Sequence, residues 1–560
     1  MSLKEGAVST IGLAWICVLA VACGSGSAGQ TDGGDDEDSG IRNGSLVWAI
    51  GFGGNDFSEE YQIGFSTEMG SAIVALPDGS SVVGGSFVDQ MTLGKGEPGE
   101  TTLDAGAWDA TAIFLARFRE DGRLEWGRAF GAYKGVSLDT IYGSYVSDIV
   151  VLDDGSLAVI GHFEDGTVFG QGEPTETTLE AWHEMGGDGF VARYEADGSF
   201  AWVRHLKGLA CLPGDYGGPC FGAALEGGNL VVVGAFEGEA TIANGRPDAV
   251  TVSGPENEDL TLAGFGPKGD LLWTRTMGRS PSMESIHAVK STGDGGFFIS
   301  GKFEKRNKSD DTTTLGYGET NETVIDCGFF EPKPQSGDGY CVFEFLARYK
   351  GNGELVFAKP VAEGTLGLKS GMAVSPESVV LAGALPGGYI MAPTDADPVR
   401  ITGDDEHELD VVARFSTKGD FIGMQTGRGA AAQAAELLPD GSVVIAGHTS
   451  MTRNDVVFGE GASGETTIAA ADCSLEAGGC AASFAARFSG DGSVLWAHVL
   501  GSRRSEGFSD QGNDLAVLPS GRIAIIGNFS QTSVFGEGEP HETALTANGK
   551  YDIFLALYEP

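Results

Sequence analysis

A two-part apolar pattern recurs along the chain. Residues 75–87 (ALPDGSSVVGGSF) and 437–449 (LLPDGSVVIAGHT) each place a short polar turn between two apolar stretches. Variants of this frame return at residues 151–163, 224–236, 291–303, 373–385 and 517–529. Two apolar stretches joined by an Asp-Gly-type turn are typical of a β-hairpin. One glycine is common to all copies, namely Gly85, Gly161, Gly234, Gly301, Gly383, Gly447 and Gly527.

Two further apolar segments follow each hairpin. The first segment is represented by IFLARF at residues 113–118 and by FAARF at residues 484–488. Every copy of it has Phe or Tyr two residues after an alanine. A period of two is the spacing of one strand face, so small and aromatic side chains are expected to pack between neighbouring sheets. The second segment follows a glycine turn and ends mostly in tryptophan, as in DGRLEW and DGSVLW. Each repeat therefore predicts four antiparallel strands.

The strand order is permuted at the two chain ends. Residues 43–48 (NGSLVW) match the fourth-strand segment, and the chain ends at Pro560 just after a third strand. Pairing of the segment around Trp48 with the strand near Tyr558 would close a ring and leave no open sheet edge. The sequence therefore predicts an all-β fold over residues 42–560. This fold is a seven-bladed β-propeller of four-stranded antiparallel blades, closed by the N-terminal strand that completes the last blade.

The repeat also carries a family resemblance. The segments LPDGSVVIAG, FAARF and DGSVLWAHVLG resemble the repeats of bacterial seven-bladed β-propeller proteins of the SBBP type, many of which are secreted proteins or lipoproteins. The resemblance covers residues 42–560. It implies a fold and no catalytic residue, because the repeat signature contains none and propellers host both binders and enzymes.

The N-terminal segment predicts export and a lipid anchor. Residues 11–22 are an apolar run, too short to span a bilayer and typical of a signal-peptide core. Residues 19–23 (LAVAC) resemble the bacterial lipobox, in which the cysteine is lipidated, although Ala20 stands where leucine is usual. We expect a signal peptide at 1–22 and a lipid-anchored, acidic, disordered tether at 23–41, attached through Cys23 to the cell envelope, at the outer membrane. An ordinary cleaved signal peptide is the alternative.

The other six cysteines form three local pairs: Cys211 with Cys220, Cys327 with Cys341, and Cys473 with Cys480. An even number and close spacing in an exported chain favour disulfides. A loop of roughly ten residues closed in this way contributes about 2.7 kcal/mol in the chain-entropy model. A zinc site would need CxxC-type spacing with histidines nearby, which the sequence lacks.

The charge balance restricts the partners. With 35 Lys and Arg against 79 Asp and Glu, the formal net charge is −44. Such a chain is repelled by nucleic acid phosphates and anionic headgroups, so we expect no nucleic acid partner and membrane contact only through the lipid anchor. The acidity is more simply a means of solubility for an exported monomer.

Paired glutamates recur in a glycine-rich motif, as in FGQGEPTETTL at residues 169–179 and FGEGEPHETAL at 535–545. Calcium binding is conceivable there. However, Glu97, Glu173, Glu319 and Glu537 lack the alternating Asp and Asn ligands of a calcium loop. The simpler interpretation is a glycine turn in which glutamate accepts hydrogen bonds from hydroxyls and backbone donors. We therefore expect no cofactor.

No catalytic residue emerges from the other polar repeats. One arginine recurs at the same strand position in most repeats, at Arg117, Arg193, Arg348, Arg414 and Arg487, so these side chains cannot converge, and we expect pairing with acidic groups between blades. His162 and His448 hold equivalent sites in two repeats, too few for a metal cluster. The recurrent tryptophans are expected to pack. His287, Asp148 and Asp514 stand near the starts of first strands and could face a central channel.

The longest insertions indicate where binding would occur. Residues 304–344 and 449–483 connect second to third strands, and residues 207–222 link two repeats. In a four-stranded blade these segments lie at one edge, opposite the tight turns, and all three cysteine pairs fall there. Loops on a rigid scaffold commonly form binding sites. We expect a non-catalytic cell-envelope binding or scaffold lipoprotein that uses this long-loop face for a protein or glycan ligand. The alternative is a secreted hydrolase or lyase acting on polysaccharide or peptide, with its site at the channel mouth.

Overall fold

The described part of the chain consists of β-strands joined by tight turns and loops. The computed structural model describes residues 44–54, 68–106, 111–130, 144–181, 187–209, 211, 219–277, 283–305, 312–316, 318–326, 341–363, 367–386, 389–391, 399–401, 408–449, 455–468, 481–501 and 510–560. The predicted signal peptide, tether and lipidated Cys23 lie outside these residues. Among the residues described, no helix has the length and apolar character needed to cross a membrane.

The strands form four-stranded antiparallel units, which we label A to G in chain order. From first to fourth strand, they are: unit A, β2 (Met69–Ala75), β3 (Ser81–Val88), β6 (Thr111–Phe118), β7 (Leu124–Phe130); unit B, β8 (Tyr145–Val151), β9 (Leu157–Phe163), β12 (Asp188–Tyr194), β13 (Phe200–Leu209); unit C, β14 (Phe221–Leu225), β15 (Asn229–Asn244), β16 (Val250–Phe265), β17 (Leu271–Met277); unit D, β18 (Met283–Ser291), β19 (Gly296–Lys305), β22 (Cys341–Lys350), β23 (Leu355–Glu363); unit E, β24 (Gly367–Val374), β25 (Ser378–Pro386), β28 (Glu408–Ser416), β29 (Phe421–Arg428); unit F, β30 (Ala430–Leu437), β31 (Val443–Thr449), β34 (Ser483–Phe488), β35 (Val494–Leu500); unit G, β36 (Gln511–Val517), β37 (Ile523–Phe529), β40 (Asp552–Tyr558), β1 (Leu46–Phe52). The predicted order of four antiparallel strands per repeat is present in each of them.

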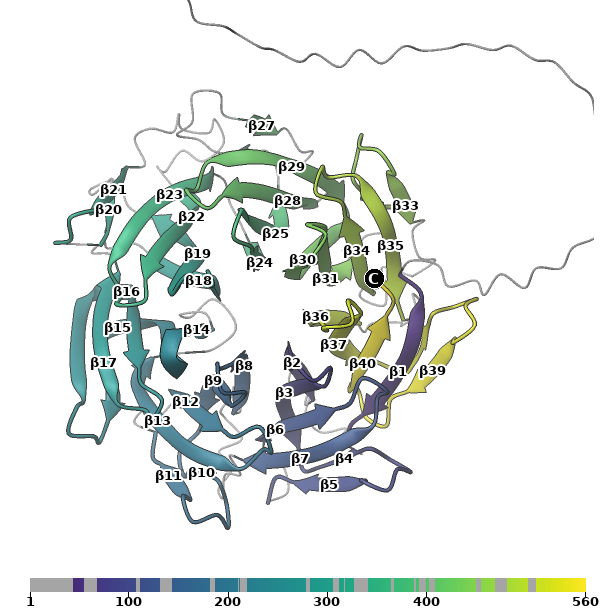
Figure 1. Ribbon diagram of the computed structural model, residues 1–560, viewed down its shortest axis with the longest axis horizontal. Coiled ribbons are helices and arrows are strands. Elements are labelled where there is room, and N and C mark those ends of the chain that lie inside the picture. The colour runs from purple at the N-terminus through teal and green to yellow at the C-terminus, as the bar shows by residue number, and fades with distance from the viewer. Residues whose placement is uncertain are drawn as a thin grey trace, which may run out of the picture. The chain divides into compact units, whose positions relative to one another are not determined.

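Small hairpins lie between the second and third strands of most units. They are β4 (Gln90–Leu93) with β5 (Thr101–Asp104), β10 (Thr167–Phe169) with β11 (Thr177–Leu179), β20 (Thr312–Leu315) with β21 (Thr323–Asp326), β26 (Tyr389–Met391) with β27 (Val399–Ile401), β32 (Val456–Phe458) with β33 (Thr466–Ile468), and β38 (Thr532–Phe535) with β39 (Thr543–Thr546). In unit C the extended ends of β15 and β16 take this place. Figure 1 shows the hairpins outside the fourth strands.

The units are arranged around a common centre with their first strands innermost (Figure 1). Each first strand contacts the first strand of the next unit, from β2 through β8, β14, β18, β24 and β30 to β36, and β36 contacts β2. Hydrogen bonds support these contacts: the Ser71 hydroxyl donates to the Val146 carbonyl at 2.6 Å, and the Asn513 amide donates to the Gly70 carbonyl at 2.7 Å. The described strands therefore form an all-β, propeller-like arrangement.

The two ends of the chain share unit G. Strand β1 pairs with β40 in antiparallel register, from Leu46 opposite Tyr558 to Phe52 opposite Ile553. The Glu559 amide donates to the Ser45 carbonyl at 2.9 Å and extends the ladder. The predicted pairing of the N-terminal segment with the last strand is confirmed.

The glycine common to the repeats lies on the second strand, and in every unit but C it lies opposite a register shift in the first strand. In unit C, Gly234 instead leaves room for Cys220 Sγ. A Cβ at Gly161 would come within 2.1 Å of the Tyr145 carbonyl oxygen, and one at Gly85 within 1.9 Å of the Met69 carbonyl oxygen. Real Cβ atoms do not approach backbone oxygens so closely. The repeat therefore needs glycine because the bulged first strand brings its carbonyl against the second strand.

The core lies between units, as the alternation of alanine and aromatic residues predicts. The repeated alanine of the third strand is buried in each unit, at Ala116, Ala192, Ala263, Ala347, Ala413, Ala486 and Ala556. Aromatic rings fill the space beside it: Phe130 of unit A packs 5.1 Å from Tyr194 of unit B, measured between ring centroids. Burial of each such ring stabilises the fold by about 1.5–3 kcal/mol.

The fourth-strand aromatic residues pack on turn glycines of the next unit. In each pair below, a Cβ on the glycine would come within 3.2 Å of the ring, and the glycine has φ between 76° and 83°. The pairs are Trp48 with Gly122, Trp126 with Gly198, Trp273 with Gly353, Phe357 with Gly419, and Trp496 with Gly44. The packing role predicted for these aromatic residues is confirmed.

Candidate functional site

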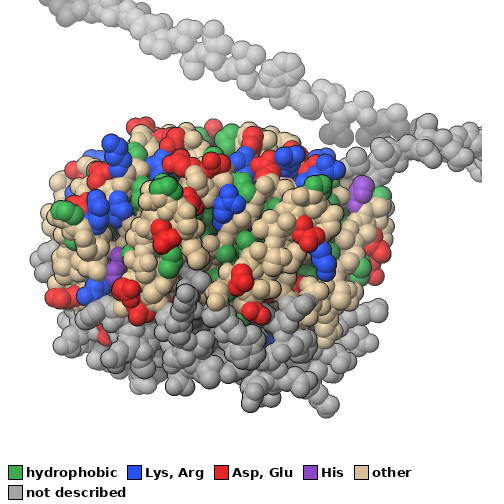
Figure 2. Space-filling view, turned by 90° about the horizontal axis from the view of Figure 1, so that it is seen from below, with side chains coloured by type: hydrophobic (Ala, Val, Ile, Leu, Met, Phe, Trp, Pro, Cys, Tyr) green, Lys and Arg blue, Asp and Glu red, His purple; other side chains and the backbone are tan. Residues whose placement is uncertain are grey.

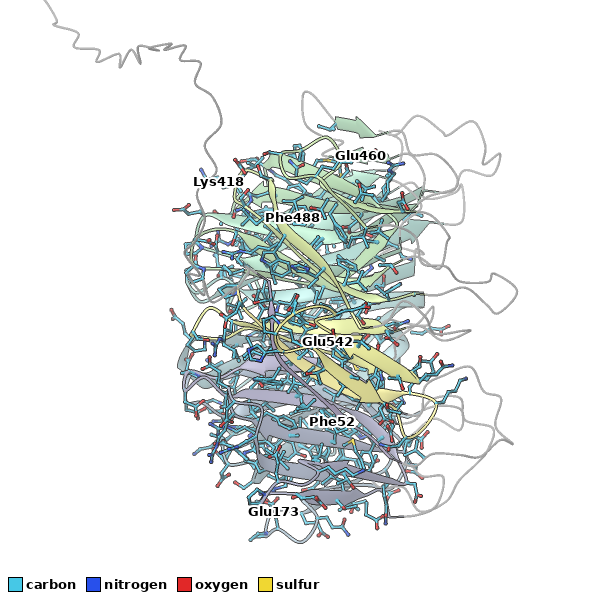
Figure 3. All side chains as sticks on the ribbon, turned by 90° about the vertical axis from the view of Figure 1, so that its right-hand side faces the viewer. Phe52, Glu173, Lys418, Glu460, Phe488 and Glu542 are labelled. Carbon is cyan, nitrogen blue, oxygen red and sulfur yellow. A yellow bond between two sulfur atoms is a disulfide. The ribbon has the colours of Figure 1, made fainter. Side chains whose placement is uncertain are left out.

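Each unit has two unlike edges. The tight turns from first to second and from third to fourth strand lie at one, which we call the turn edge. The second-to-third connections and the links between units lie at the other, the loop edge. In Figure 3, Lys418 in the turn between β28 and β29 marks the turn edge. The excursions 304–344 and 449–483, predicted to bind a ligand, lie only in part within the described residues, which include their small hairpins β20–β21 and β32–β33.

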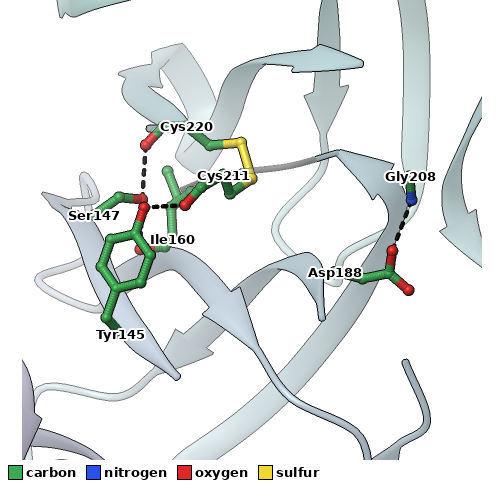
Figure 4. The surroundings of a disulfide bond; sticks show 7 residues. All are labelled: Tyr145, Ser147, Ile160, Asp188, Gly208, Cys211 and Cys220. Carbon is green, nitrogen blue, oxygen red and sulfur yellow. Dashed lines mark hydrogen bonds between the residues drawn. A yellow bond between two sulfur atoms is a disulfide. The ribbon is translucent and has the colours of Figure 1, made fainter. Parts of the chain in front are cut away.

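A disulfide joins units B and C at the loop edge (Figure 4). Cys211 and Cys220 are bonded, as predicted, and both are buried. The Tyr145 hydroxyl donates to the Cys211 carbonyl, and the Ser147 hydroxyl donates to the Cys220 carbonyl at 2.8 Å. Both ends of the link are thereby fixed to the innermost strand β8.

The other two predicted disulfides fall outside the described part of the chain. Cys327, Cys473 and Cys480 are not among the described residues, and for Cys341 the described part is the backbone of β22 alone. The bond between Cys211 and Cys220 is therefore the one predicted disulfide that the described residues contain. Bonding of Cys327 to Cys341 and of Cys473 to Cys480 stays a prediction.

A histidine–aspartate pair lies beside the disulfide of units B and C. His205 Nε2 is 2.8 Å from the Asp188 carboxylate, which also accepts from the Gly208 amide at 2.9 Å. The Asn244 side-chain amide is 3.1 Å from His205 Nδ1. The side chains of His205 and Asp188 are only 6% and 1% exposed, so substrate has no access to them. This group holds the end of β13 and has no catalytic geometry.

Charged side chains from four innermost strands gather around the centre. The Lys290 ammonium of β18 lies 2.9 Å from the Glu436 carboxylate of β30. Asp148 of β8 accepts from the Gly222 amide at 2.9 Å, and Asp514 of β36 accepts from the Ile73 amide at 2.9 Å. Both aspartates thus join their unit to the next one.

Burial controls the protonation of these aspartates. It raises the pKa of Asp148 to about 7 and that of Asp514 to about 6, against the opposing effects of the Lys290 ammonium and of backbone donors. Glu436 raises the pKa of Lys290, which stays protonated. Among the described residues of the innermost strands, the Lys290 cation thus interacts with two aspartates, Asp148 and Asp514, whose pKa values are raised toward neutrality.

His287, the third residue predicted to face the channel, also lies on an innermost strand. Its Nδ1 is 3.0 Å from the Glu344 carboxylate, and the two side chains are 12% and 2% exposed. Burial raises the pKa of Glu344, while His287 opposes the increase. His287 Nδ1 and Glu344 Oε1 both lack a hydrogen bond among the described residues, so the close approach is an ion-pair contact. A carboxylate beside an imidazole is one part of the usual arrangement of a general base.

Sequence reasoning missed Lys290, Glu436 and Glu344. Lys290 pairs across the hairpin with Phe298 and Glu436 with Val444, so they hold the same repeat position, where unit B has Val150. The sequence did contain a signal for Lys290 and Glu436, because two side chains of opposite charge stand at a repeat position that is apolar in unit B. Glu344 had no such signal, because the third strands carry polar residues at this end without a fixed pattern.

The repeated arginines do not form a site. Arg193 pairs with Asp154 of its own unit, and its Nη1 donates to the Pro267 carbonyl of the next unit at 2.9 Å. Arg487 pairs with Asp440 in the same way at 2.7 Å. The acidic partner therefore belongs to the same unit, and the expectation of acidic partners between blades was wrong. The contact with the neighbour is made to a carbonyl, because turns of adjacent units meet there. Figure 2 shows acidic and basic side chains interspersed along the outer wall.

The paired glutamates of the glycine-rich motif accept backbone hydrogen bonds. Glu173 accepts from the Phe200 amide at 2.9 Å, and Glu176 from the Gly172 amide at 2.7 Å. Glu539 likewise accepts from the Leu46 amide at 2.6 Å. The first glutamate fastens the hairpin to the fourth strand and the second closes the turn, as the simpler interpretation predicts.

The two histidines at equivalent repeat positions, His162 and His448, make separate contacts. His162 is fully buried, and the Gln433 side chain lies 3.0 Å from His448 Nδ1. Within the described residues, no group of three or more His, Cys, Asp or Glu could hold a metal ion.

Comparisons with known proteins assign no family. No family model and no curated protein matches the chain. Among solved structures, the Pyrococcus horikoshii acylaminoacyl peptidase is 9% identical over 72% of this chain and 52% of its own, with a TM-score of 0.26. The Streptococcus pneumoniae NanB sialidase is 8% identical over 86% and 96%, with a TM-score of 0.25. The leech intramolecular trans-sialidase is 8% identical over 91% and 98%, with a TM-score of 0.22.

The chain thus spans about half the length of the peptidase. Similarities at these TM-scores carry no argument about activity, and the resemblance to SBBP-type repeats stays a prediction.

Proposed function

We propose that this chain is a non-catalytic binding scaffold of the cell envelope. Residues 42–560 form a closed seven-bladed propeller, exported and held at the outer membrane by a lipid on Cys23. The loop edge binds a protein or glycan partner, and the tight turns of the opposite edge hold the ring rigid.

The link between Cys211 and Cys220 carries this proposal. Its two carbonyls are fixed to Tyr145 and Ser147 of one innermost strand, and its disulfide is buried. Anchored loops on a rigid scaffold bind with little loss of conformational entropy. The repeated charges support the same reading, because arginines, glutamates and channel aspartates are engaged in contacts within and between units.

The test is capture of a partner from envelope extract. The bait is the chain from residue 23 onward with Cys23→Ser, which cannot be lipidated. In the loop-edge variant, residues 327–340 are replaced by Gly and Ser at equal length, with Cys341→Ser to avoid a free thiol. The matched control replaces Glu377 and Lys418, both exposed at the turn edge, by serine.

We expect the loop-edge variant to lose the captured partner and the control to retain it, with unchanged circular dichroism in both. Equal capture by all three proteins would show that this excursion of the loop edge is not the binding surface. Radiolabelled fatty acid incorporated in cells into the native chain, and absent from Cys23→Ser, tests the anchor separately.

One observation favours a second candidate function. His287 of the innermost strand β18 lies 3.0 Å from the Glu344 carboxylate, and a hydrolase or lyase acting on polysaccharide or peptide would have its base on such a strand. Release of reducing ends or amino groups from envelope polymers by the native chain, lost in His287→Ala, would favour the enzyme over the scaffold.

A further inference from the structure

In units A, B and D, the arginine of the third strand makes the same two contacts at the turn edge. Arg117 pairs with Asp78 in the first turn of its own unit and donates through Nη1 to the Ala196 carbonyl of the next unit at 2.9 Å. Arg348 contacts Asp294 and the Thr417 carbonyl in the same way. A guanidinium thus fills the space between the turns of two adjacent units.

Unit C departs from this rule at both positions. The segment TLAGF has Gly264 where five other units have arginine, and the turn EGG has Gly227 where unit B has Asp154. Unit G has Leu557 at the arginine position, but Arg522 of its first turn places a guanidinium 3.2 Å from the Glu120 carboxylate of unit A. The Trp273 indole lies over Gly264, because a Cβ on that glycine would come within 2.3 Å of Trp273 Cε2. Neither half of the ion pair is present between units C and D.

A cavity of about 220 Å³ lies at this junction. Its wall includes Glu226, Asn229, Gly264, Leu272, Trp273 and Gly351. Leu272 is 49% exposed, and Glu226 is also exposed, so the cavity is open to a partner. The missing arginine explains why the space is present here.

The cavity retains the groups that receive a guanidinium elsewhere in the ring. Gly351 follows the third strand of unit D, in the position that Ala196 and Pro267 hold in units B and C. The Glu226 carboxylate lies one residue from the position of the missing aspartate. Trp273 adds an aromatic wall, and Arg275 already packs its guanidinium 5.9 Å from the centroid of this ring.

We propose that this cavity binds the guanidinium of an arginine side chain presented by a partner protein. The ligand would donate to the Gly351 carbonyl, pair with Glu226 and lie against Trp273. The shape of this ligand follows from the arginines that fill the equivalent junctions. Its positive charge suits a chain of net charge −44. This site lies at the turn edge and is independent of the loop-edge proposal.

The test uses N-acetyl-arginine amide as probe and the chain from residue 23 with Cys23→Ser. Binding is followed by ligand-observed NMR titration in 0.15 M salt, which screens unspecific attraction to the acidic surface. N-acetyl-citrulline amide is the uncharged probe of the same shape. The variants are Glu226→Gln and the matched control Glu377→Gln, whose side chain is exposed in the corresponding turn of unit E.

We expect saturable binding of the arginine probe, weakened about tenfold or more by Glu226→Gln and unchanged by Glu377→Gln, since loss of a charged hydrogen bond costs at least about 1.4 kcal/mol. The citrulline probe should bind at least tenfold more weakly. Absence of saturable binding, equal binding of both probes, or equal weakening by the two glutamine variants would each overturn the proposal.

Discussion

Single residues of the repeat have roles set by the space around them. The glycine common to the copies follows from the bulge of the first strand, because its missing Cβ leaves room for a carbonyl oxygen. Gly161→Ala should therefore destabilise the fold by roughly 1–3 kcal/mol, the usual cost of overpacking. Gly423→Ala is the matched control, since no atom lies within 4 Å of its added Cβ. Thermal unfolding monitored by circular dichroism checks both; equal midpoints would contradict the steric explanation.

The titration of Asp148 is also a residue-scale property. Burial raises its pKa to about 7 from an ordinary 3.8, so the folded chain holds this proton at a higher pH than the unfolded chain does. Its contribution to stability is greatest below about pH 4, falls as the pH rises to 7, and is constant above. Asn stays neutral at every pH. The free energy of unfolding of Asp148→Asn should therefore fall less between pH 5 and 8 than that of the native chain, by roughly 1–2 kcal/mol after solvent screening. Melting temperatures across this range check it, with Glu377→Gln expected to follow the native profile.

At the scale of elements, the small hairpins are fastened by carboxylates and not by metal in our interpretation. Glu173→Ala should lower the free energy of unfolding by about 1 kcal/mol, because the Phe200 amide loses its acceptor.

Calcium added after chelation should leave the melting temperature of the native chain unchanged, because both glutamates of the motif bind backbone amides. A calcium-dependent increase that disappears in Glu173→Ala would instead favour a calcium site.

Unit F contains a natural version of this substitution. Ala462 stands in the motif where units A, B, D and G have the first glutamate, and the Val494 amide donates to the Ser463 carbonyl at 3.0 Å instead. The hairpin β32–β33 also joins β29 directly. A backbone acceptor can therefore replace the carboxylate.

The elements show why sequence reasoning succeeded for the fold and less so for the site. Strand order follows from a pattern repeated along the chain, so errors in one copy are corrected by the others. The contacts of Glu344 and Asp188 occur once each and depend on the placement of separate strands. The arginine partners were mistaken because a sequence repeat shows which residues recur and not which neighbour they meet.

For the whole molecule, the decisive feature is the shared last unit. Gly44 receives the Trp496 ring and Gly122 receives Trp48 just as Gly198 receives Trp126, so the junctions of the unit that contains both chain ends have the same packing as a junction within the chain. The Asn513 amide reaches the Gly70 carbonyl as Ser71 reaches Val146. The pairing of β1 with β40 therefore completes unit G with the same order of four strands as the other units.

An engineered disulfide across β1 and β40 tests this closure. Ala49 and Ala556 are register partners, both buried and small, so cysteines there add little volume. Opposed residues of antiparallel strands have Cα atoms about 4.5–5.5 Å apart, within the range that a disulfide spans. The double variant should form an intrachain bond that links the two ends, raises the melting temperature and is reversed by reductant. Each single variant serves as control, and failure to cross-link in a double variant that folds would contradict the pairing of β1 with β40.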